Sequence, residues 1–443
     1  MLGLPSSSKA NRHNISKGTL VCLFLCLSLG GCSSAYYGKG KALLEKQDYD
    51  KAIENLYHAA TQNPKKADNW RELGIAFYKK GGLDKALEYL KQANRIRPDH
   101  KTIFYVGLIY EQRQELDSAV NAYKGYLLLK SKSEMSERVK ARLIIVMEKK
   151  IGEEAHKALV EEQSINSAKI PTNTAAVTYF NTSALDSSLA VLGKGLAEFL
   201  TTDLSKVKQL KIVERSRLQR ILEELEFSRT KYVDQSTAPR IGKLLGAHQL
   251  ITGSILGADT KHLRIDAGLI LTGTGEINLT PEVTGTIDQF FALEKALTFR
   301  IIEKMGIELT PEEKDAIQKI PTKSFSALLA YCRGLDYLDR GMYPEAQTEF
   351  RKASSEDPKF QEALDQKVFL EHKGSVENLS NFEMAFEKTD KEERTTSIAL
   401  GERLSQTNEN SSLIQDLSKD NPNTQAFGSQ TGTVIIKGDL HKK

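Results

Sequence analysis

One cysteine stands where its thiol could be modified chemically. Residues 1–18 are polar and basic, and the apolar run TLVCLFLCLSL follows at 19–29. That run is too short to span a hydrocarbon core, which takes about 20 helical residues. The small residues Gly30 and Gly31 then precede Cys32. They fit a peptidase cleft that cuts before Cys32, whose thiol could then carry acyl chains.

These segments have the order of a secretory signal peptide, and the ending LGGC resembles the bacterial lipobox. The resemblance implies that residues 1–31 are removed by cleavage between Gly31 and Cys32, and that Cys32 is lipidated. Each buried methylene contributes about 0.8 kcal/mol, so several acyl chains hold a protein firmly on a bilayer. Because Ser33 is not acidic, the resemblance implies a lipid anchor in the outer membrane, facing the periplasm. The alternative is a plain signal peptide that ends in cysteine.

Residue types suited to catalysis form no recognisable motif. The sequence has no GxxxxGK[ST] phosphate loop, no GxSxG elbow and no HExxH motif among its eight histidines. Glu214 and Arg215 follow a predicted strand, but helix-start electrostatics and a local ion pair explain them better than catalysis. Cys332 fits a small buried hydrophobic residue. We therefore expect no enzyme activity, no cofactor and no metal site.

A 34-residue period runs through the N-terminal part of the chain. Four residues recur at this spacing: Gly40, Ala52, Ala59 and Pro64 return as Gly74, Ala86, Ala93 and Pro98. The period and the residue set resemble the tetratricopeptide repeat, a pair of antiparallel helices. Small residues let the two helices approach, and proline ends the second one. Three repeats are predicted at 32–130, followed by a capping or linker helix at 131–166.

Repeats of this kind present a concave groove to a peptide or a helix. If this stack does so, the groove positions are Asp68, Arg71, Tyr78, Lys79, Phe104 and Glu111. A protein partner is then expected in the groove. The alternative is a spacer without a bound peptide.

The period changes after Pro171, which indicates a second domain at 170–310. Strands are predicted at 175–181, 209–214 and 248–256, and helices at 185–206, 216–225, 236–245 and 289–306. The spacing of Ser216 and Gln219 predicts a capping box. A hairpin with one apolar and one polar face is predicted at 262–287. The pattern indicates an α/β domain.

Three runs in this domain carry a family resemblance: GKGLAEFLTTDLSKVKQLKIVERSRLQRILEEL at 193–225, GKLLGAHQLITGSI at 242–255 and LRIDAGLILTGTGEI at 263–277. They resemble the family of CsgG, the curli production assembly/transport component. They are more distantly similar to the N-terminal domain of the TolB translocation protein. The resemblance implies a periplasmic α/β domain in a lipidated outer-membrane protein that often forms homo-oligomers.

The sequence departs from the curli channel in one respect. The channel subunit has two extra transmembrane hairpins, and each spanning strand takes about 9–11 alternating residues. The sheet already requires the hairpin at 262–287, so we expect the domain without the pore. A ring-forming outer-membrane secretion channel subunit is the alternative, and a domain that senses a small ligand is a second one.

The repeat pattern returns after the α/β domain. Its residues are Gly334, Tyr337, Ala346, Phe350, Ala353 and Pro358. They predict a fourth repeat at 321–372, which must dock on 289–320, on 361–372 or on another subunit. Residues 373–443 are polar and predict a largely disordered tail, with a short strand at 433–436.

The expected fold class is multidomain: an α-helical tetratricopeptide-repeat solenoid, an α/β domain similar to CsgG and TolB, one further helical repeat and a disordered tail. The formal charge is +4 and falls to about +1 without the leader, which gives no electrostatic reason to expect a nucleic-acid partner. The expected function is a protein-binding scaffold or assembly factor, attached to the membrane through lipid on Cys32.

Overall fold

The computed structural model describes residues 33–129, 133–225, 233–234, 236–257, 262–279, 282–393 and 395–396. The predicted signal peptide, Gly31, Cys32 and the strand predicted at 433–436 lie outside these ranges. Met1–Phe382 belongs to one compact unit and Glu383–Lys443 to a second one, which is treated separately. In the described part of the chain, every helix is too short or too polar to cross a membrane.

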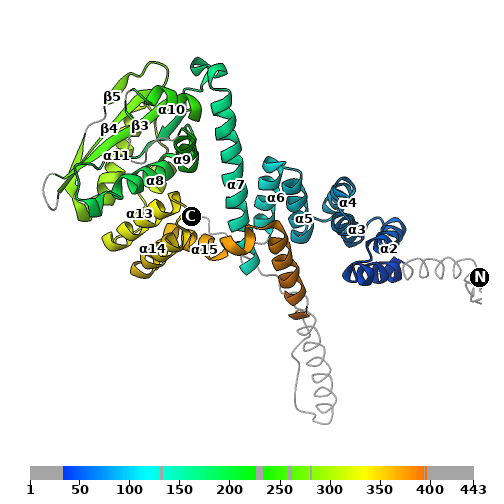
Figure 1. Cartoon of the computed structure of the whole chain (residues 1–443). Helices are drawn as coiled ribbons and strands as arrows, with labels where there is room; N and C mark the ends of the chain where they lie inside the picture. Colours follow the sequence, from blue (N-terminus) through cyan, green and yellow to red (C-terminus); the bar gives the residue numbers. More distant parts are fainter. Residues whose placement is uncertain are drawn as a thin grey trace, which may run out of the picture. The chain divides into compact units, whose positions relative to one another are not determined.

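The N-terminal part consists of three helical hairpins (Figure 1). Their helices are 33–45 with α2 (Tyr49–Gln62), α3 (Ala67–Lys79) with α4 (Leu83–Ile96), and α5 (His100–Gln112) with α6 (Leu116–Leu129). The recurring glycines explain the close packing within each hairpin. A Cβ atom built on Gly74 would lie 2.7 Å from Cγ of Leu90, and one on Gly107 would lie 2.5 Å from Cε1 of Tyr123. This solenoid confirms the first part of the predicted fold class.

A single long helix, α7 (Glu134–Val160), follows the third hairpin. It begins after Ser133, whose hydroxyl accepts a hydrogen bond from the Ser136 amide at 3.1 Å. One side of α7 packs on α6, and other parts of it contact α9, α10 and α15. The helix thus contacts both the last helix of the repeat stack and the helices of the next domain.

The α/β domain contains a mixed six-stranded sheet. Its strands are β1 (Thr174–Val177), β2 (Lys211–Ile212), β3 (Gln249–Gly257), β4 (His262–Leu271), β5 (Ile277–Leu279) and β6 (Val283–Thr286). The order is β2-β1-β3-β4-β5, and β6 also pairs with β4. β1 runs parallel to β2 and β3, whereas β3 and β4 form a long antiparallel pair. The predicted return strand is therefore split into β5 and β6, which pair with opposite ends of β4.

Helices cover both faces of the sheet. α9 (Arg215–Glu224) and α10 (Ala238–Leu245) form a core with Leu250 and Ile270 on one face. Ile251 follows Leu250 and so points to the other face, where it is fully buried. α8 (Leu192–Leu204) and α11 (Phe290–Lys304) contact β1 and β4, respectively. This mixed sheet with helices confirms the predicted α/β domain.

One local prediction in this domain is wrong. The capping box at Ser216 and Gln219 does not form, because α9 begins at Arg215 with Glu214 as its N-cap residue. Ser216 therefore lies inside the first turn instead of at the cap. Glu214 makes no side-chain capping hydrogen bond.

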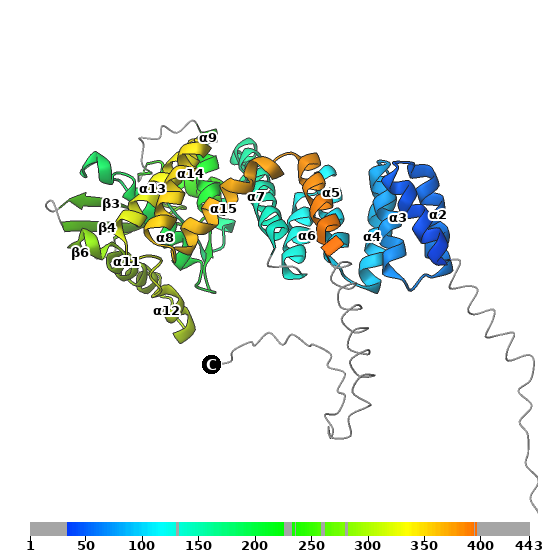
Figure 2. The same ribbon diagram turned by 90° about the horizontal axis from the view of Figure 1, so that it is seen from below.

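A further helical hairpin follows α12 (Pro311–Ile317). It consists of α13 (Phe325–Asp339) and α14 (Tyr343–Glu356), and α15 (Gln361–Val376) packs on it. α13 also contacts α8, and α15 lies along α7 (Figure 2). The hairpin thus docks on α15, which is one of the predicted alternatives, and also on α8. Aromatic rings fill this junction, because Phe199 of α8 lies 5.7 Å from Tyr331, between ring centroids.

The segment predicted as a largely disordered tail, 373–443, begins with helix. α15 continues to Val376, and residues 379–393 are helical. The physical reason is an apolar spacing within a polar stretch, since Val376 and Phe382 are fully buried. Residues 397–443 lie outside the described ranges.

Candidate interaction sites

The groove positions predicted from sequence lie on α3 and α5, the first helices of the second and third repeats. Arg71 is the centre of a charge network on α3. Its Nη1 atom lies 2.7 Å from Oδ1 of Asp68 and 3.4 Å from Oδ2 of Asp99, and its Nε atom lies 3.2 Å from Oε1 of Glu72. Burial alone would lower the pKa of Arg71, but the three carboxylates outweigh it and raise that pKa. Arg71 and Asp68 are thus held in place by ion pairs.

Tyr78 and Lys79 lie at the end of α3. The Tyr78 hydroxyl accepts a hydrogen bond from Nε2 of Gln112 at 3.1 Å, and its ring meets that of Tyr105 edge-on at 5.4 Å. Lys79 is half-buried. Tyr78 is only 6% exposed, so this end of α3 presents the partly exposed Lys79 above a buried aromatic ring.

Phe104 and Glu111 are more deeply buried than a free groove requires. Phe104 is fully buried, and the Glu111 side chain is 8% exposed. The hydroxyl of Tyr123 donates to Oε2 of Glu111 at 2.9 Å, and Nε of Arg142 donates to both carboxylate oxygens at 3.0 and 2.9 Å. Glu111 therefore belongs to a buried pair with Arg142 of α7.

Sequence reasoning missed Arg142 because it treated α7 as a cap. The available signal was a single arginine on the apolar face of a helix that packs on a repeat. A buried charge needs a partner of opposite sign, and Glu111 was the candidate at hand.

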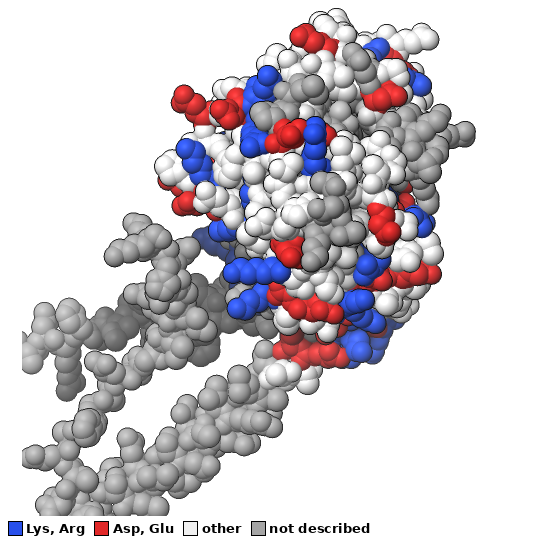
Figure 3. Space-filling model, turned by 90° about the vertical axis from the view of Figure 1, so that its left-hand side faces the viewer, with Lys and Arg blue, Asp and Glu red and all other residues white. Residues whose placement is uncertain are grey.

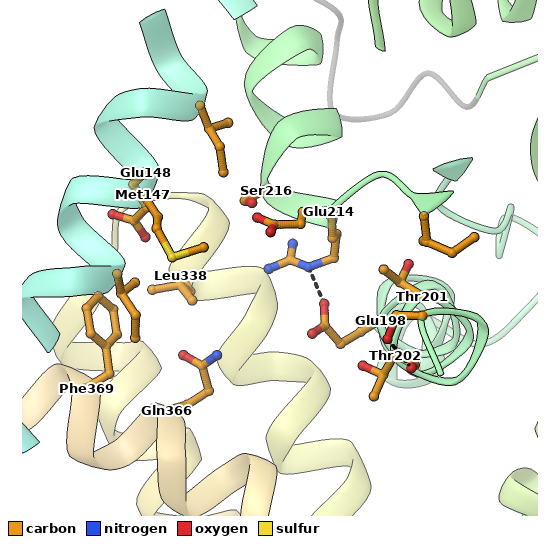
Figure 4. Close-up of a pocket in the computed structure, with 15 residues that line it drawn as sticks. Met147, Glu148, Glu198, Thr201, Thr202, Glu214, Ser216, Leu338, Gln366 and Phe369 are labelled. Atoms are coloured by element: carbon orange, nitrogen blue, oxygen red, sulfur yellow. Dashed lines mark hydrogen bonds and ion pairs between the residues drawn. The ribbon is translucent and has the colours of Figure 1, made fainter. Parts of the chain in front are cut away.

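A second candidate site is the crevice between α7, α8, α9, α13 and α15 (Figure 4). Its volume is about 490 Å³. Its lining combines apolar side chains with carboxylates and hydroxyls: Ile144, Met147, Glu148, Ile151, Glu198, Thr201, Thr202, Ser205, Ile212, Glu214, Arg215, Ser216, Leu338, Gln366 and Phe369. Although Glu148 is exposed at the rim, desolvation by the surrounding crevice raises the pKa of its carboxyl group. A crevice of this composition could hold an apolar side chain with a polar end.

Arg215 closes one wall of this crevice through ion pairs. Its Nε atom lies 2.6 Å from Oε2 of Glu198, and its Nη1 atom lies 2.6 Å from Oδ1 of Asp339. Nη1 also donates to the Tyr179 hydroxyl at 3.3 Å. The predicted local ion pair is therefore wrong, because Arg215 pairs with residues that are distant in sequence. Since Asp339 belongs to α13, this contact joins the α/β domain to the C-terminal hairpin.

Metal ligation and thiol chemistry concern the described residues outside these two sites. Within the described ranges, His, Cys, Asp and Glu side chains form no group of three that could hold a metal ion. Cys332 is buried, as predicted, and burial raises the pKa of its thiol to about 12. On the face shown in Figure 3, the described acidic and basic side chains are interspersed.

Together, the fold and these sites define a multidomain protein in which helical repeats precede and follow an α/β domain in the sequence. The family model for the curli production assembly/transport component CsgG matches residues 153–277. A tetratricopeptide repeat model matches residues 43–106. The chain thus contains a CsgG domain and tetratricopeptide repeats, which confirms both resemblances.

Parts of this chain are similar to known proteins. Anaphase-promoting complex subunit 3 of Schizosaccharomyces pombe is 26% identical over 132 residues, which are 30% of this chain and 19% of that protein. The Arabidopsis OM64 TPR domain is 19% identical with a TM-score of 0.25, covering 26% of this chain and 94% of its own. The LpoB C-terminal domain from Salmonella enterica is 21% identical with a TM-score of 0.22, covering 29% of this chain and 91% of its own.

Proposed function

We propose that this protein is a binding scaffold or assembly factor, related to the curli assembly/transport component and attached to the outer membrane through lipid on Cys32, facing the periplasm. The observation that carries the proposal is the presence of tetratricopeptide repeats and a CsgG domain in one chain. In this proposal the repeats recruit a protein partner and the α/β domain mediates assembly. The role is non-catalytic and needs no cofactor.

The charge network on α3 supports the recruiting role. Asp68 is 26% exposed on its side chain and pairs with Arg71 and also with Nη2 of Arg97 at 2.8 Å. Side chains that are already held in place lose little conformational entropy when a partner binds. The inner side of α3 therefore suits recognition of a peptide with polar groups.

Mass spectrometry and fractionation of the native protein test the anchor. We expect an N-terminal peptide that begins at Cys32 and carries acyl chains, in the outer-membrane fraction. Cys32→Ala should lose the acyl mass, whereas the matched control Cys332→Ala should keep it. A native chain that retains residues 1–31 without lipid would contradict the anchor.

Cross-linking and capture with the mature chain test the recruiting role. Lys79→Glu reverses a charge at a groove position, so capture of a specific partner should fall about tenfold, which corresponds to about 1.4 kcal/mol. Lys65→Glu is the matched control, because Lys65 is exposed and precedes α3. Equal capture by both variants would remove the groove from the proposal. Stable conductance in planar bilayers would favour a channel subunit instead.

A further inference from the structure

A segment of the same chain covers the inner face of the third repeat. α15 ends at Val376, and Phe382 follows six residues later, fully buried. The centroid of the Phe382 ring lies 5.0 Å from that of Phe104 and 5.9 Å from that of Tyr123. Phe104 is a predicted groove position, so this segment lies on the groove itself.

Arg142 binds the backbone of this segment. Its Nη1 atom donates to the carbonyl oxygen of Val376 at 2.6 Å and to that of Glu377. The last carbonyls of a helix have no partner within the helix and carry partial negative charge. The guanidinium that pairs with Glu111 thus also binds the C-terminal end of α15, while its Cζ atom lies 5.9 Å from the centre of the Phe382 ring.

The residues after α15 form a new helix start that presents the aromatic ring. Oδ1 of Asn378 accepts hydrogen bonds from the amides of Ser380 at 2.8 Å and Asn381 at 3.2 Å. Asn378 therefore caps the helix that begins at residue 379, and Phe382 belongs to its first turn. In chain order, the segment consists of a helix end whose carbonyls bind Arg142, an asparagine cap and an aromatic residue one turn later.

We propose that residues 376–382 are an internal ligand of the groove, and that the partner is a protein segment of the same chemistry. Such a segment presents two backbone carbonyls to Arg142 and an aromatic side chain to Phe104 and Tyr123. The partner binds by displacing residues 376–382, so the free chain is self-inhibited. This proposal rests on the proposed partner-binding role of the repeats.

Binding of a peptide in trans tests the displacement. The probe is a fluorescein-labelled synthetic peptide with the sequence of residues 374–390, added to the full mature chain with Cys32→Ala. The probe can bind only those molecules whose groove is open. Its apparent affinity is therefore the affinity for the open groove multiplied by the fraction of molecules that are open. Phe382→Ala in the chain should therefore tighten probe binding about tenfold or more. Adding Phe104→Ala should abolish the gain, and Met384→Ala, at a side chain that is 59% exposed, should bind like the wild type.

Amide hydrogen exchange gives an independent readout if Phe382→Ala impairs folding. It is measured on the Cys32→Ala chain, in which residues 374–390 are unchanged. A saturating amount of the peptide should speed amide exchange at residues 379–382, and a peptide with alanine at position 382 should not. Equal probe affinity of wild type and Phe382→Ala, or no binding to either together with unchanged exchange, would overturn the proposal. If partner capture still depends on Lys79 in that case, the recruiting role stands and only the internal ligand fails.

Discussion

At the residue scale, a buried cluster of charged side chains joins α11 to α8. Glu294 of α11 is fully buried, and its Oε2 atom lies 2.9 Å from Nζ of Lys295, which also pairs with Asp203 of α8. Burial, together with the negative charge of Asp203, raises the pKa of Glu294 to about 7 from an ordinary 4.5. The folded protein therefore keeps a proton on this carboxyl in a range where the unfolded chain has lost it.

This proton makes the stability depend on pH. Between pH 4.5 and about 7 the folded state binds one more proton than the unfolded state, so the free energy of unfolding falls as pH rises through this window. Glu294→Gln is neutral at every pH and should remove this dependence, raising the melting temperature at pH 8 by about 1–2 °C per kcal/mol gained. Thermal melts from pH 4.5 to 8 check it, with exposed Glu303→Gln on the same helix as control. Parallel curves for wild type and Glu294→Gln would refute the assignment.

Gly107 sets the distance between α5 and α6. An added Cβ atom would lie 2.5 Å from Cε1 of Tyr123. This ring cannot move easily, because it is fully buried and its hydroxyl donates a hydrogen bond to Glu111. Gly107→Ala should thus destabilise the fold by about 1–3 kcal/mol through overpacking. In Gly38→Ala the new methyl group meets nothing within 4 Å, so that variant should be neutral or more stable. Urea denaturation measures both, and equal midpoints would show that the helices separate without cost.

At the element scale, the sequence predicts the helical hairpins and the sheet correctly, but it does not predict the contacts between distant segments. The period of Gly40, Gly74 and Gly107 reports packing within a hairpin, which is local in sequence. The pairing of Arg142 with Glu111 and with the end of α15 joins distant segments, and no spacing rule connects them. Alternating residues likewise predict β4. The split of the return strand into β5 and β6 was not predicted. The sequence did contain a signal for it, because Pro281 lacks the amide hydrogen that a continuous ladder needs.

The docking of α13 on α8 depends on charge as well as on aromatic packing. Asp339 of α13 lies 2.6 Å from Arg215 and 3.1 Å from Lys194, and although burial opposes ionisation, the two cations lower its pKa. Asp339→Asn should leave both cations poorly compensated, costing about 3–5 kcal/mol. Limited proteolysis should then cut the Asp339→Asn variant near α13 more readily than the wild type. Asp365→Asn is the matched control, because Asp365 is exposed, and it should be cut like the wild type. Unchanged cleavage would show that the aromatic contacts suffice.

At the scale of the whole molecule, α7 joins the repeats to the α/β domain by continuous helix. On its N-terminal half, Arg142 pairs with Glu111 of the repeats. On its C-terminal half, Glu154 lies 3.2 Å from Arg217 of α9. Because both sets of contacts belong to one helix, unfolding of one part removes contacts from the other. The unit up to Phe382 is therefore expected to unfold cooperatively.

A proline in the middle of α7 tests this coupling. Met147 is half-buried between the two sets of contacts, and Met147→Pro removes a backbone hydrogen bond and clashes with the preceding turn, at about 3 kcal/mol or more. Calorimetry should show one main transition for wild type and for the control Met147→Ala, which keeps the helix. It should show two transitions for Met147→Pro, because the repeats and the α/β domain no longer share an unbroken helix. One transition at the wild-type temperature in all three would mean that α7 connects the two parts without coupling their stabilities.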